Sequence, residues 1–66
     1  MNATAKANRI AEQIEAAAST LRHPGHQYDA RWIARLVRRG NTEAAKATVK
    51  RLPGIGSILP KAFWTL

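Results

Sequence analysis

The apolar residues of the chain recur at helical spacing in stretches that turn residues separate. In the first stretch, from about Thr4 to Arg22, intervals of three or four residues draw one apolar stripe: Ala7, Ile10, Ile14, Ala17 and Leu21. The polar positions Glu12, Glu15 and Ser19 fall on the opposite side of the predicted helix. The stripe is narrow and rich in alanine, which suits close packing against another helix, or against a second copy of the chain through Ile10, Ile14 and Leu21.

The second stretch is bounded by turn residues on both sides. We expect His23-Pro24-Gly25-His26-Gln27 to interrupt the helical pattern, because proline cannot continue a helix and glycine permits a reversal. Asp29 is a suitable N-cap, and Gly40 is a suitable stop after Arg39. One side of this predicted helix is apolar: Ala30, Trp32, Ile33, Ala34, Leu36 and Val37.

The remaining chain predicts one more full helix and a short apolar one. Asn41 caps a helix that runs from Thr42 to about Leu52, where Pro53-Gly54 ends it. Its inner stripe is Ala45, Val49 and Leu52, and its exposed basic row is Lys46 and Lys50. Ser57 can cap a last short helix with Pro60 in its first turn, and the apolar surface of this helix is Ile58, Leu59, Ala62, Phe63 and Leu66. Such a tail either closes the core or meets a partner.

These elements predict an all-α fold, a compact bundle of three helices plus a short C-terminal helix. The 66 residues leave room for a single domain, 1–66. A domain this short buries only about 60% of its unfolded surface, so its stability is expected to be marginal.

Catalytic and metal-binding chemistry find little support in the composition. There is no cysteine, and the four acidic residues are scattered over different predicted faces. His23 and His26 lack further ligands, and no serine is placed in a recognisable nucleophile–base arrangement. We therefore expect no catalytic residue, no metal and no cofactor, and we expect that the protein is not an enzyme.

The net charge of +7 is distributed unevenly. Residues 1–29 carry three basic and three acidic side chains, so residues 30–66 carry all of the net charge. Four arginines fall within an arc of about 100° on the second predicted helix, without an acid among them: Arg31, Arg35, Arg38 and Arg39. Like charges four residues apart on a helix repel one another. A bound anion would offset this repulsion, so the face predicts an anionic partner.

The segment Leu52-Pro53-Gly54-Ile55-Gly56 resembles the hairpin of the helix-hairpin-helix family of DNA-binding motifs. The resemblance implies phosphate contacts by the backbone at Gly54 and Gly56, with Ile55 as a buried anchor. It covers about a dozen residues, and Pro60 stands where the family usually has a small residue. The alternative is a structural turn that only folds the tail back.

Nucleic acid, DNA before RNA, is therefore the first predicted partner, bound mainly through phosphates. The predicted contacts are the basic residues of the second half and two glycines: Arg31, Arg35, Arg38, Arg39, Lys46, Lys50, Arg51, Gly54, Gly56 and Lys61. Trp32 lies on the apolar side of its predicted helix and is expected in the core, whereas Trp64 is open to core packing, partner contact or base stacking.

The alternative function is that of a small inhibitor or adaptor that docks on an acidic surface of a larger protein, as small phage- or plasmid-encoded inhibitors do. Aromatic residues and arginine are enriched at interface hot spots, which makes Tyr28, Trp32, Phe63 and Trp64 the candidate interface residues. A membrane surface is disfavoured, since the segment 54–64 holds a single lysine. The start of the chain does not have the pattern of a signal peptide, so we expect a cytoplasmic protein.

Overall fold

The computed structural model describes residues 3–52 and 54–66 of the chain. Its elements are α1 (Ala3–Ala18), α2 (Pro24–Arg38), α3 (Thr42–Arg51) and two 3₁₀ turns, η1 (Ile55–Ile58) and η2 (Lys61–Thr65). No strand occurs within the described residues, so the predicted all-α bundle is confirmed. None of the helices in these ranges has both the length and the apolar character that a membrane span requires.

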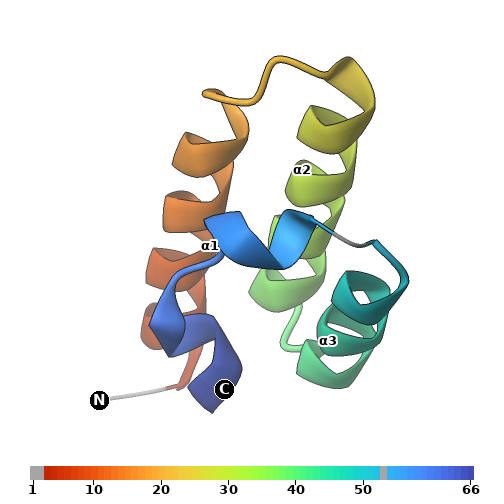
Figure 1. The fold of residues 1–66 in the computed structure, drawn as a ribbon. Helices are drawn as coiled ribbons and strands as arrows, with labels where there is room; N and C mark the ends of the chain where they lie inside the picture. The colour runs from red at the N-terminus through yellow and green to blue at the C-terminus, as the bar shows by residue number, and fades with distance from the viewer. Residues whose placement is uncertain (1–2, 53) are drawn as a thin grey trace.

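Helices α1 and α2 run side by side in opposite directions, and α3 turns back against the end of α2 (Figure 1). Alanines make the close approach of α1 and α2 possible, because Ala11 and Ala18 of α1 and Ala30 and Ala34 of α2 are all fully buried. The buried stripe of α1 is wider than predicted. Ala11 and Ala18 belong to it, whereas Ala17 and Leu21 are only half-buried.

Helix α1 also ends four residues before the predicted Arg22. The hydroxyl of Thr20 donates to the carbonyl of Ala17, and the amide of Leu21 donates to the carbonyl of Ala18. The chain therefore leaves the helical path after Ala18, the last buried alanine of α1. Ile10 and Ile14 pack inside this single chain. The predicted dimer stripe is therefore not a free surface.

Helix α2 begins at Pro24, five residues before the predicted start at Asp29. Nδ1 of His23 accepts a hydrogen bond from the amide of Gly25 at 3.1 Å, so His23, and not Asp29, is the N-cap. Proline has no amide hydrogen, but the first turn of a helix needs none, so Pro24 starts this helix instead of breaking it. Asp29 lies half-buried within the helix.

The predicted junction between α2 and α3 is confirmed. Gly40 adopts a left-handed φ of 79° and donates to the carbonyl of Val37, while the amide of Asn41 donates to the carbonyl of Leu36. These two bonds form a Schellman motif, which satisfies the free carbonyls at the end of α2. Oδ1 of Asn41 then caps α3 by accepting from the amide of Ala44.

The last twelve residues form two 3₁₀ turns in place of the predicted single helix capped by Ser57. Leu59 and Pro60 are extended between the turns. Proline disfavours the helical conformation of the residue before it, which explains why no continuous helix forms here. Ser57 lies inside η1, and its hydroxyl donates to the carbonyl of Gly54.

These last twelve residues, 55–66, which we call the tail, close the core. Ile55, Leu59 and Phe63 are buried, and η1 contacts all three α-helices. The tail crosses the α1–α2 pair and ends beside the first turns of α1 (Figure 1).

Candidate functional site

The outward face of α2 carries both aromatic and basic side chains. A rotation of about 100° per residue places four residues of α2 and its C-cap residue Arg39 within an arc of about 100°, opposite the buried Ile33 and Val37. We call this set the α2 ridge: Tyr28, Arg31, Trp32, Arg35 and Arg39. All five side chains are exposed, and the arc contains no acidic residue.

Trp32 is a correction to the predicted core and not to the candidate interface residues, which include it. It was expected in the core, but it is 40% exposed, and Tyr28 one turn earlier is 69% exposed. The space between α1 and α2 is already filled by alanines together with Ile33 and Val37, and this close packing leaves no room for an indole ring. The spacing of Tyr28, Trp32 and Arg35 by four and then three residues was a signal for one shared outward face.

The ridge has a small hollow of about 120 Å³. Two aromatic and two basic residues line it, namely Tyr28, Arg31, Trp32 and Arg35. Two aromatic residues and two arginines therefore border the same space. A ligand that combines a flat ring with a negative charge would match both of these features.

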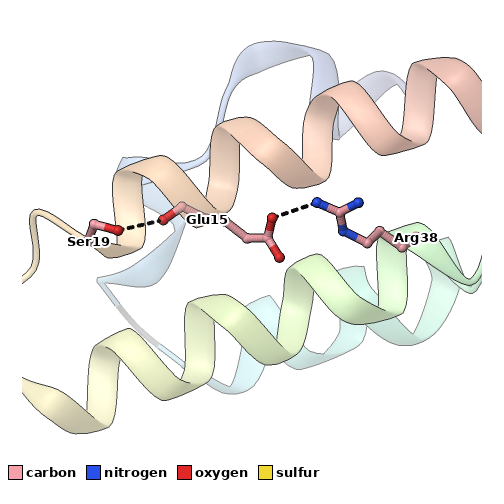
Figure 2. A network of polar contacts seen from close by, with 3 residues as sticks. All are labelled: Glu15, Ser19 and Arg38. Atoms are coloured by element: carbon pink, nitrogen blue, oxygen red, sulfur yellow. Dashed lines mark hydrogen bonds and ion pairs between the residues drawn. The ribbon is translucent and has the colours of Figure 1, made fainter.

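Arg38 does not belong to the ridge. Its Nη2 lies 2.6 Å from Oε1 of Glu15, which joins α2 to α1 (Figure 2). The prediction that no acid lies among the α2 arginines holds within α2 itself, but Glu15 of another helix, α1, pairs with Arg38. Both side chains are well exposed, so the ion pair is worth about 1 kcal/mol or less. It is also the only ion pair within residues 3–52 and 54–66, so the ridge arginines have no acidic partner there.

The two lysines of the predicted basic row of α3 differ in exposure, since Lys46 is half-buried and Lys50 is exposed. Nζ of Lys46 donates to the carbonyl of Leu66 at 2.7 Å, so this half-buried lysine holds the end of the tail. Lys50, Arg51 and Lys61 are exposed, on α3 and η2 and not on α2. The candidate phosphate contacts therefore lie on several elements, and on the α2 ridge arginines share a helix face with exposed aromatic residues.

The glycine-containing turn after α3 keeps part of the predicted geometry. Ile55 is buried, as expected of an anchor, and Gly54 is exposed with a left-handed φ of 97°. The amide of Ile55 donates to the carbonyl of Leu52, and the element after the turn is the four-residue η1 and not an α-helix. Pro53 of the motif lies outside the described residues. The phosphate contacts of Gly54 and Gly56 stay a prediction.

The two aromatic residues near the C-terminus have different roles. Phe63 was predicted to face a partner, but its exposed fraction is 0%, so it is part of the core. Trp64 packs against it edge to face, with ring centroids 5.0 Å apart, and is 46% exposed. Only Trp64 of this pair remains a candidate for contact with a partner.

A second hollow, of about 450 Å³, lies where the end of the tail meets α1 and the α2–α3 junction. Its lining is mixed in character and comprises Lys6, Ala7, Arg38, Arg39, Gly40, Thr42, Thr65 and Leu66. Arg39 is the one ridge residue that also lines this hollow.

The two histidines lie together at the start of α2, with ring centroids 4.7 Å apart. Nδ1 of His23 already accepts the capping hydrogen bond from Gly25. No group of three or more histidine, cysteine, aspartate or glutamate side chains gathers in the part of the chain that the structure describes.

Comparison of the chain with known proteins finds no matching family model, no matching curated protein and no matching solved structure. The function is therefore inferred from the residues of the α2 ridge.

Proposed function

We propose that this protein binds nucleic acid through the α2 ridge, mainly by contacts between arginines and phosphates. The observation that carries the proposal is the placement of Arg31, Arg35 and Arg39 on one outward face without an acid. Guanidinium groups suit this role, since their planar fork matches the oxygens of a phosphate.

The ridge has an electrostatic cost in the free protein. Arg31 and Arg35, and again Arg35 and Arg39, are like-charged pairs four residues apart, each unfavourable by a few tenths of a kcal/mol. Glu15 of α1 forms its ion pair with Arg38 and not with a ridge arginine. A polyanion laid along the ridge would relieve this repulsion.

The fold does not depend on the ridge. The core consists of residues on the other side of α2 and on the neighbouring elements, and it is complete without any ridge side chain. Exposed tryptophan and tyrosine side chains grouped on one face are typical of a binding surface.

DNA is the first polymer to test, because the turn at Leu52–Gly56 resembles a DNA-binding hairpin. Lys50, Arg51 and Lys61, with Gly54 and Gly56, would add phosphate contacts beyond the ridge. Such contacts confer affinity with little sequence preference.

An acidic protein surface is the second candidate. The observation that favours it is the exposure of Tyr28 and Trp32 between arginines, since these three residue types dominate interface hot spots. Affinity for nucleic acid distinguishes the two candidates directly.

The test is fluorescence anisotropy with labelled duplex DNA, single-stranded DNA and RNA at low and near-physiological salt. We expect dissociation constants below about 10 µM at low salt and a log affinity that falls linearly with log salt. The charge reversal R31E/R35E should abolish binding.

The matched control is R9E/R22E, which reverses two exposed arginines of the first half of the chain. Each reversal changes the charge by two, so both double variants lower the net charge from +7 to +3. Equal losses in the two variants would mean nonspecific attraction and would contradict a site on α2. If no nucleic acid binds, the ridge should be used as bait for an acidic protein.

A further inference from the structure

The aromatic residues of the α2 ridge are not explained by phosphate binding. Tyr28 and Trp32 lie four residues apart, so their Cα atoms are about 6 Å apart along the helix axis. Neither side chain makes a hydrogen bond or a ring contact with another described residue. Their rings are therefore available to a ligand.

Duplex and single-stranded nucleic acids differ in what they offer to such rings. In a duplex the base faces are stacked on one another, and only base edges, sugars and phosphates are accessible. In a single strand the base faces are free, and they stack on aromatic side chains without regard to sequence. The exposed rings of Tyr28 and Trp32 thus have a counterpart on a single strand that a duplex lacks.

Two arginines of the ridge lie beside its aromatic residues. Arg31 and Arg35 line the hollow of about 120 Å³ together with the two aromatic residues. A base stacked on Trp32 would leave its own phosphate within reach of these guanidinium groups. Arginine can also stack on a base itself, so the face binds bases and charge together.

From this arrangement we infer that the ligand of the α2 ridge is single-stranded nucleic acid, with bases stacked on Trp32 and Tyr28 and phosphates bound by Arg31, Arg35 and Arg39. The inference rests on the proposed function and names its ligand class.

The length of the ridge sets the size of the site. Tyr28 and Arg39 are eleven residues apart, which corresponds to about 16 Å along a helix. At about 3.4 Å per nucleotide of a stacked strand, the ridge spans roughly five nucleotides. An oligonucleotide of about ten nucleotides therefore covers it completely.

The experiment uses the chain with the substitution W64F. The sequence has two tryptophans, so Trp32 is then the only one left. The fluorescence of Trp32 is followed during titration with a ten-nucleotide DNA strand of mixed sequence and, separately, with the blunt duplex of that strand. We expect the single strand to quench the emission of Trp32 and to bind several-fold more tightly than the duplex. Neutralising three phosphates of a single strand corresponds to a log–log salt slope of about −2.

The decisive variant is W32A, compared with W32F by anisotropy. Loss of one stacked base predicts roughly 5- to 150-fold weaker binding of the single strand by W32A. W32F should retain most of the affinity, because a phenyl ring still stacks on a base. Because Trp32 is outside the core, circular dichroism should show that W32A is folded.

Two results would overturn the inference in distinguishable ways. Tighter binding to the duplex, with W32A equal to the parent protein, would refute single-strand stacking and leave the proposed nucleic-acid binding intact. Absence of binding to either polymer, and to the RNA strand of the same sequence, would refute both proposals and leave an acidic protein surface as the remaining candidate ligand of the ridge.

Discussion

At the residue scale, two neighbouring arginines of α2 have different surroundings. Arg38 is bound to Glu15 of α1, whereas Arg35 faces solvent beside Trp32 and has no acidic partner among the described residues. The difference arises because three residues turn a helix by about 300°, which places Arg38 outside the ridge and toward α1.

Replacing each arginine by glutamine should separate a ligand contact from a contact within the fold. We expect R35Q to weaken nucleic-acid binding and to reduce the magnitude of the salt slope by about 1, because one phosphate contact is lost. R38Q should change the affinity less and lower the unfolding free energy by about 1 kcal/mol or less. Anisotropy at several salt concentrations and urea denaturation measure the two effects, and equal salt slopes for both variants would contradict the assignment.

At the scale of elements, the junction between α2 and α3 depends on the backbone conformation of one residue. Gly40 has a φ of 79° and connects the Schellman bonds of α2 to the Asn41 cap of α3. A side chain at this φ is strained, although no neighbouring atom lies within 4 Å of the position of an added Cβ.

We therefore expect G40A to lower the unfolding free energy by about 1 kcal/mol through backbone strain alone. For a domain of this size the melting temperature should fall by about 4–8 °C. The matched control is G56A, since Gly56 has no positive φ and an added Cβ would meet Val49 and Trp64 at an ordinary 3.8 Å. Thermal unfolding followed by circular dichroism tests the pair, and a loss of equal size in G56A would contradict the explanation by strain.

At the scale of the whole molecule, the tail completes the core. Three α-helices leave an apolar surface open, and Ile55, Leu59 and Phe63 cover it, while Lys46 holds the end of the tail through the carbonyl of Leu66. The ridge lies on the opposite side of α2 and remains uncovered. Helix α2 therefore contributes one face to the core and the other to the candidate site.

Phe63 and Trp64 are adjacent aromatic residues that should respond very differently to truncation. F63A removes a fully buried ring and is expected to lower the unfolding free energy by about 3–5 kcal/mol. That loss is comparable with the total stability of a chain of this length, about 3–10 kcal/mol. W64A removes a side chain that is nearly half exposed and should cost far less. Urea denaturation compares the two, and a stable F63A would show that the tail is dispensable to the core.

Local patterns in the sequence were sufficient for the parts of the protein that depend on neighbouring residues. The apolar periodicity predicted the three helices, and Gly40 and Asn41 predicted the α2–α3 junction, because capping involves residues only a few positions apart. The arginine-rich face of α2 was likewise readable from spacing by helical rotation.

The tertiary structure decided what depends on residues far apart in the chain. Glu15 and Arg38 are 23 positions apart, and Lys46 and Leu66 are 20 apart, so no local pattern could reveal either contact. Whether Trp32 is buried or exposed depends on how closely the alanines bring α1 and α2 together. That distance depends on the packing of both helices and not on the sequence of α2 alone. Periodicity places side chains around a helix, whereas burial depends on what the rest of the chain covers.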